Sequence, residues 1–145
     1  MHVLELMKSH VIKTNPEATL QDAVDMLDLY QISGLPVVDS QGDLIGVITE
    51  YDIIQALLPE YHIVKKESGS EWVGLHDRVE RIKNKTVGEA MSKPAISIDD
   101  AADVLEAASV MLEKRIKRLP VTNKGKLVGI ISRIDICQAV LEGQI

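Results

Sequence analysis

The spacing of hydrophobic residues changes several times along the first part of the chain, and each change predicts a new element. Thr19 can cap the start of a helix with its hydroxyl, and the apolar residues behind it recur at helical spacing: Leu20, Ala23, Val24 and Leu27. Two short apolar runs follow, and the polar residues between them include a glycine, which is typical of a β-hairpin. The expected elements are a strand at 11–14, a helix at 19–30, strands at 35–38 and 44–48, and a helix at 52–58 that ends before Pro59.

The last part of the chain shows the same order of patterns. A helix there is expected to turn Val104, Ala107, Ala108 and Met111 inward, because they recur at helical spacing. The expected elements are a strand at 95–98, a helix at 100–114, strands at 119–121 and 127–131, and a helix at 133–141. Strands and helices mixed in this way indicate an α/β or α+β fold.

The two parts are copies of one sequence pattern. The matching segments are VLELM at 3–7 with VGEAM at 87–91, ISGLPV at 32–37 with IKRLPV at 116–121, and GVITEYD at 46–52 with GIISRID at 129–135. The offset is 84 residues from Leu35 to Leu119 but 83 from Gly46 to Gly129, so one residue is missing from the second hairpin loop. We therefore expect a first repeat at 1–58, a connector at 59–85 and a second repeat at 86–145.

The I-x-x-L-P-V and G-h-h-T/S-x-x-D motifs (h, apolar), in this order of elements, resemble the CBS domain, which takes its name from cystathionine beta-synthase. The tandem resembles a Bateman module. The resemblance implies two small sheets packed by helices, related by a pseudo-twofold axis, with ligand clefts between the repeats. It also implies a homodimer in which exposed helices form a flat disc, and an adenosine-containing ligand such as AMP, ADP, ATP or S-adenosylmethionine.

Each T/S-x-x-D motif has two interpretations. Thr49 with Asp52, and Ser132 with Asp135, can form capping boxes that bind the free backbone N–H groups of a helix. The same helix start can attract phosphate, while a carboxylate can accept the hydroxyl protons of a ribose. The resemblance assigns both aspartates to the ribose and Thr49 and Ser132 to hydroxyl or phosphate contacts.

Other binding residues follow from the resemblance alone. The first-strand residue near phosphate is commonly Thr in the family, and Lys13 departs from that pattern, so it is either a phosphate contact or a solvated residue. The family arrangement pairs Lys13 with Asp135 and Ser97 with Asp52. Arg133 is either a surface residue or a phosphate ligand. The expected ligand-binding residues are Lys13, Ala18, Ile32, Ser33, Val47, Thr49, Asp52, Ser97, Ala102, Ile116, Lys117, Ile130, Ser132, Arg133 and Asp135.

Composition and charge exclude several classes of protein. Of 145 residues, 16 are Lys or Arg and 22 are Asp or Glu, and only 3% are aromatic, which argues against nucleic-acid binding. No apolar run is long enough for a membrane span, and the single Cys137 fits a reducing compartment, so we expect a cytoplasmic protein. Four scattered histidines predict no metal site, and the chain has no nucleophile elbow, Walker loop or G-x-G-x-x-G motif, so we expect no catalytic residues and no cofactor.

The connector is expected to begin as a loop and to continue as a helix. Trp72, Leu75, Val79 and Ile82 share one face of that helix, which either packs on its own module or serves as a docking surface or lid. The predicted function is a non-enzymatic regulatory module that binds an adenine nucleotide or adenosyl ligand and signals to an unidentified partner protein. The alternative is a ligand-independent assembly or scaffold subunit, in which the T/S-x-x-D motifs are only helix caps.

Overall fold

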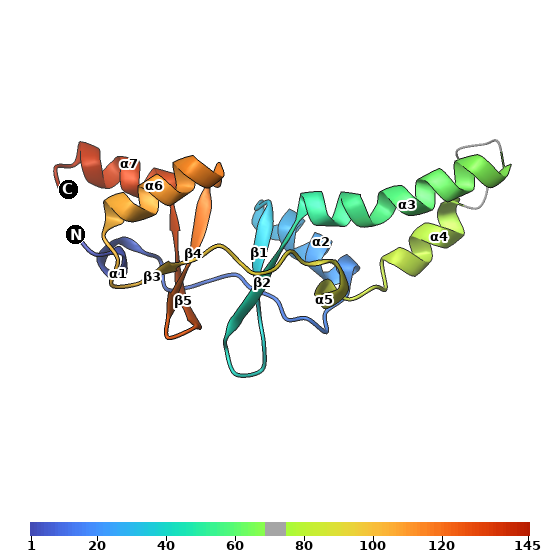
Figure 1. The fold of residues 1–145 in the computed structure, drawn as a ribbon, viewed down its shortest axis with the longest axis horizontal. Coiled ribbons are helices and arrows are strands. Elements are labelled where there is room, and N and C mark those ends of the chain that lie inside the picture. The colour runs from blue at the N-terminus through green and yellow to red at the C-terminus, as the bar shows by residue number, and fades with distance from the viewer. Residues whose placement is uncertain (69–74) are drawn as a thin grey trace. The chain divides into compact units, whose positions relative to one another are not determined.

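The computed structural model describes residues 1–68 and 75–145 (Figure 1). Its helices are α1 (Val3–Leu6), α2 (Leu20–Tyr30), α3 (Glu50–Ser68), α4 (Leu75–Ile82), α5 (Val87–Ala90), α6 (Val104–Lys114) and α7 (Arg133–Leu141). Its strands are β1 (Gly34–Val38), β2 (Leu44–Thr49), β3 (Ile98–Asp99), β4 (Arg118–Asn123) and β5 (Lys126–Ser132). The elements form two small sheets with helices, which confirms the predicted fold class.

The chain forms two compact units. Unit 1 contains residues 1–12, 40–44 and 95–145, and unit 2 contains residues 13–39 and 45–94. Each unit therefore draws on both of the predicted sequence repeats. The repeat limits at 1–58 and 86–145 describe the sequence and stay a prediction.

Unit 1 is built on a three-stranded sheet in the order β3-β4-β5. Strand β3 pairs parallel with β4, while β4 pairs antiparallel with β5 from Arg118 opposite Ser132 to Asn123 opposite Lys126. Helix α6 is amphipathic, and the alanine and larger apolar residues on its inner face pack against this sheet. The fully buried core residues include Val3, Val104, Ala107, Met111, Leu119, Val121 and Ile131.

Unit 2 is built on the β1–β2 hairpin and helix α2. Thr19 caps α2 as predicted, because its side chain accepts a hydrogen bond from the backbone N–H of Asp22. The strand expected at 11–14 is reduced to one parallel bridge, in which Thr14 exchanges two backbone hydrogen bonds of 3.0 Å with Pro36 and Val38. The buried apolar residues here are Leu20, Ala23, Leu27, Leu35, Val37, Val38, Ile48, Ile82 and Val87.

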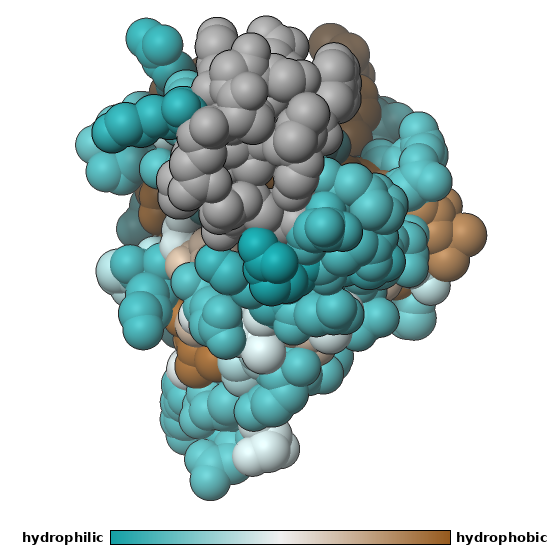
Figure 2. Space-filling model, turned by 90° about the vertical axis from the view of Figure 1, so that its right-hand side faces the viewer, coloured by the Kyte–Doolittle hydropathy of each residue, from teal (hydrophilic) through white to brown (hydrophobic). Residues whose placement is uncertain are grey.

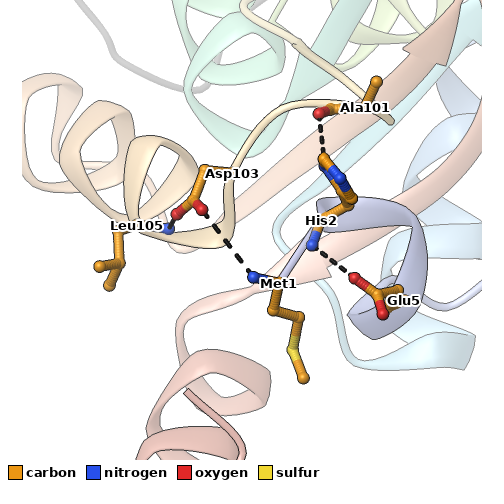
Figure 3. Close-up of polar contacts among 6 residues, drawn as sticks. All are labelled: Met1, His2, Glu5, Ala101, Asp103 and Leu105. Atoms are coloured by element: carbon orange, nitrogen blue, oxygen red, sulfur yellow. Dashed lines mark hydrogen bonds and ion pairs between the residues drawn. The ribbon is translucent and has the colours of Figure 1, made fainter.

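Each repeat begins with a lead segment, residues 1–8 or 87–92, and each lead segment joins the sheet of the other repeat. In unit 1, Lys8 and Ile130 exchange two backbone hydrogen bonds of 2.9 Å. In unit 2, Ser92 and Val47 do the same at 2.9 and 3.0 Å. The first segment is also held where the His2 ring nitrogen Nδ1 lies 2.7 Å from the Ala101 carbonyl oxygen (Figure 3).

A glycine in each sheet allows this close approach. A Cβ atom at Gly129 would overlap the sulfur of Met7 and lie 3.0 Å from the Lys8 carbonyl oxygen. A Cβ atom at Gly46 would lie 2.7 Å from the sulfur of Met91. The glycine of each G-h-h-T/S-x-x-D motif is therefore required for packing of the lead segment.

Two predicted helix limits were wrong. Helix α3 continues through Pro59 to Ser68, although the proline ring removes one hydrogen bond and the expectation was a helix that ends at 58, followed by a loop. Helix α6 begins at Val104 rather than near 100, because Asp103 caps it by accepting a hydrogen bond from Leu105 N at 2.8 Å. Asp100 is instead buried, and both of its carboxylate oxygens accept hydrogen bonds from Asn123.

The connector helix packs on unit 2. Val79 and Ile82 of α4 line a small apolar pocket together with residues of α2 and α3, and Ile82 is only 5% exposed. The same pocket is lined by Ile53 and Leu57 of α3, which are both half-buried. The packing alternative therefore holds for Val79 and Ile82, whereas Trp72 lies outside the described residues.

Candidate functional site

Motif site 2, defined by Thr49 and Asp52 in unit 2, lies where β2 ends and α3 begins. Asp52 Oδ2 accepts hydrogen bonds from Thr49 N and Thr49 Oγ1, both at 3.0 Å. Asp52 Oδ1 accepts a hydrogen bond from Ser92 Oγ at 2.7 Å, and the residue is 5% exposed. The carboxylate is therefore fixed on both oxygens by protein donors.

Motif site 1, defined by Ser132 and Asp135 in unit 1, lies where β5 ends and α7 begins. Asp135 Oδ2 accepts a hydrogen bond from Ser132 N at 3.0 Å, and Asp135 N donates to Ser132 Oγ at 3.3 Å. The Nζ atom of Lys8 lies 3.4 Å from Asp135 Oδ1. The Lys8 side chain is 71% exposed, whereas the aspartate is buried.

Both motifs form capping boxes. In each, the hydroxyl accepts from the backbone N–H of the aspartate, and the aspartate accepts from the backbone N–H of the hydroxyl residue. The capping interpretation is therefore correct. A carboxylate has about four lone-pair positions, so a cap does not use all of its accepting capacity.

Lys8 and Ser92 contact the motif carboxylates, and neither was expected at a site. They occupy equivalent positions, because an offset of 84 residues relates them. The repeat alignment contained this signal, since each directly follows the repeated VLELM or VGEAM segment. Which sheet the segment would join could not be deduced from local sequence.

The residues of the I-x-x-L-P-V motif lie next to the motif sites. The backbone N–H of Arg133 donates to the Lys117 carbonyl at 3.0 Å, and Arg133 Nε donates to the Ile116 carbonyl at 2.9 Å. In unit 2, the backbone N–H of Glu50 donates to the Ser33 carbonyl at 3.1 Å. Ser33 and Lys117 are therefore each hydrogen-bonded through the backbone to the first residue of the helix that follows the motif, α3 or α7.

The remaining expected residues divide between the units. Ala18 and Ala102 use their carbonyl oxygens to accept hydrogen bonds from Val87 N and Val3 N, so they anchor the lead segments. Lys13 is exposed in unit 2, and Ser97 is exposed in unit 1. Because Lys13 and Asp135 belong to different units, as do Ser97 and Asp52, these two pairings stay predictions.

Residues 1–68 and 75–145 contain neither a metal-ligand cluster nor a membrane-spanning helix. In this part of the chain, no group of three or more His, Cys, Asp or Glu side chains is placed to hold a metal ion. No helix in the same ranges is long and apolar enough to cross a membrane.

The family model described as "CBS domain" matches residues 3–59 and 87–142. The chain therefore belongs to the CBS domain family, and it carries two copies of the domain in tandem. Together with the two small sheets, one in each unit, these matches define the chain as a CBS pair.

Three relatives are similar over most of the chain. The CBS domain-containing protein CBSX2, chloroplastic, of Arabidopsis thaliana is 29% identical over 92% of this chain, and a CBS domain-containing protein of Dictyostelium discoideum is 31% identical over 97% of this chain and 91% of its own length. The chain spans 59% of the length of CBSX2 and also of its Arabidopsis relative CBSX1. The crystal structure of CBSX2 in complex with AMP has a TM-score of 0.75, with 28% identity over 99% of this chain and 98% of that chain.

Proposed function

We propose that this chain is a non-enzymatic regulatory module that binds an adenine nucleotide or adenosyl ligand at its motif sites and signals to a partner protein by a conformational change. The observation that carries the proposal is the pair of buried carboxylates, Asp52 and Asp135, each fixed beside a helix N-terminus. The AMP complex of CBSX2 supports it, because that protein shares the fold of this chain.

The bonds around Asp52 indicate how a ligand would be recognised. Fixing a carboxylate before binding lowers the entropic cost of recognising a ribose diol. Binding at either motif site can change the conformation only through a difference in affinity for two arrangements, typically about 1 to 3 kcal/mol. We extend the proposal to a reducing compartment such as the cytoplasm, because the free Cys137 is exposed.

Calorimetric titration with AMP, ADP, ATP and S-adenosylmethionine tests the proposal. The matched variants are Asp52→Asn and Asp135→Asn. Asparagine at 52 can keep the cap, because its carbonyl accepts from Thr49 while its amide donates to the Ser92 hydroxyl. Saturable binding that one variant loses while its unfolding midpoint stays unchanged would support the proposal, and the absence of binding to all four ligands would refute it.

A scaffold subunit is the second candidate, and the complete capping boxes favour it. Every buried side-chain polar atom in the described ranges has a hydrogen-bond partner in the protein, so the motif residues have a structural role without any ligand. A thermal-shift measurement separates the two candidates. A ligand at about 100 times its Kd adds roughly 2.7 kcal/mol of stability to a binding module and none to a scaffold.

We also propose that the module forms a homodimer through its exposed helices. The face of the molecule in Figure 2 is mainly hydrophilic with separate hydrophobic patches. The exposed apolar residues of α6 and α7 include Leu112 at 74% and Leu141 at 87%. Sedimentation equilibrium of the Leu112→Ser/Leu141→Ser variant tests this, and a dimer of unchanged affinity would contradict it.

A further inference from the structure

The two motif sites carry opposite charge. Around motif site 1 the chain places four cationic residues, and the equivalent positions around motif site 2 hold none. The cationic residues are Lys8, Lys117, Arg118 and Arg133, and their counterparts are Ser92, Ser33, Gly34 and Glu50. The two environments therefore differ by five formal charges, from four positive to one negative.

Contacts in unit 1 place three of these cations at the motif, and the backbone of the fourth, Lys117, accepts a hydrogen bond from Arg133 N. Lys8 reaches Asp135, as described above. Arg118 lies directly opposite Ser132 in the β4–β5 ladder, so the two side chains share a face of the sheet. Arg133 uses Nε to hold the Ile116 carbonyl, and its planar guanidinium has four further N–H donors.

Contacts in unit 2 show that the counterpart residues, none of which is cationic, occupy the same places. Gly34 lies beside Thr49, because a Cβ atom at position 34 would be 3.2 Å from the Thr49 methyl carbon. Ser92 donates to Asp52 where Lys8 contacts Asp135. Glu50 is exposed and takes the place of Arg133, where its carboxylate would repel a phosphate.

We propose that motif site 1 selects adenosine ligands that carry a phosphate chain, whereas motif site 2 selects adenosyl ligands without one. This inference rests on the proposed function, since it assigns different ligands to the two sites. Cations beside a helix N-terminus attract phosphate, and the attraction grows with each phosphate group. Since all four cations are exposed, each contributes modestly and the effect decreases with salt.

The test is a titration series with adenosine, AMP, ADP and ATP in metal-free buffer. In the Asp52→Asn variant, which leaves motif site 1 intact, ATP should bind about tenfold or more tightly than adenosine at about 0.1 M salt. The Lys117→Ser/Arg133→Glu variant carries the residues of the other repeat and should remove this preference. In the Asp135→Asn background, Ser33→Lys/Glu50→Arg should raise the affinity of motif site 2 for ATP by a similar factor.

The matched control is Lys124→Asn. Lys124 lies at the far end of the β4–β5 hairpin from Arg118, about 20 Å away at the rise of a strand, and asparagine accepts its positive φ. Lys124→Asn should leave the series at about 0.1 M salt unchanged, because that distance is about twice the screening length of about 10 Å. Equal affinity for adenosine and ATP at motif site 1 would overturn the selectivity alone, whereas no binding of any of these four or of S-adenosylmethionine would refute the proposed function as well.

Discussion

Substitution of Gly129 by alanine should destabilise the protein, because the added Cβ would occupy the space of the lead segment. The sulfur of Met7 can move, but the Lys8 carbonyl oxygen, 3.0 Å from the new atom, is held by a 2.9 Å hydrogen bond from Ile130. Overpacking of this kind costs about 1–3 kcal/mol. Separation of the segment from β5 would lose two backbone hydrogen bonds, which is about the same cost.

Urea unfolding measures this cost. A loss of about 2 kcal/mol corresponds to a midpoint lower by about 1 M, given a slope of about 2 kcal/mol per molar urea. Gly34→Ala is the control, since the nearest atom to its Cβ would be a Thr49 methyl at 3.2 Å and the nearest backbone atom the Ile48 carbonyl oxygen at 3.5 Å, an ordinary contact, and it should cost less than half as much. In a double-mutant cycle, the loss of stability in the Met7→Ala/Gly129→Ala variant should differ from the sum of the losses in the two single variants, because the added Cβ meets the Met7 side chain. An unchanged midpoint for Gly129→Ala, or equal costs at both glycines, would refute the reasoning.

Three further substitutions test local features. Asp52→Ala should lower the free energy of unfolding by about 2 kcal/mol, because it removes the cap and the acceptor of the Ser92 hydroxyl. Asp52→Asn should lower it by less than about 1 kcal/mol, and equal urea midpoints for the two variants would contradict this. Pro59→Ala should stabilise the protein by about 1–3 kcal/mol and raise its helical circular dichroism, and a loss of stability would show that the proline ring is needed. A hydrogen bond from Lys83 lowers the pKa of Glu80, so Lys83→Met should raise that pKa toward its ordinary value in an NMR pH titration.

Features set by neighbouring residues were predictable from the sequence. Thr19 and the helix Arg133–Leu141 were found because a hydroxyl before an apolar period is a local signal for a helix start. The hairpins were found because a glycine-containing polar loop separates two apolar runs. The T/S-x-x-D motifs were also recognisable, since capping needs a hydroxyl and a carboxylate three residues apart.

Features that depend on distant partners were not predictable. Lys8 and Ser92 acquire their roles through sheets more than thirty residues away in sequence, and no local spacing encodes that choice. Helix α3 continues past Pro59 to Ser68, so the proline does not end the helix here, and a local breaker signal was misleading. Asp100 was included in a helix, but its burial beside Asn123 makes it part of the strand connection.

The exchange of lead segments means that neither repeat contains its own complete core. A fragment cut at the connector would lack the apolar side chain that fills its centre, Val3 in one case and Val87 in the other. A chain with only one repeat could fill that space with the lead segment of a second, identical chain. Because Lys8 and Ser92 lie in the exchanged segments, a charge change in one repeat alters the motif site of the other.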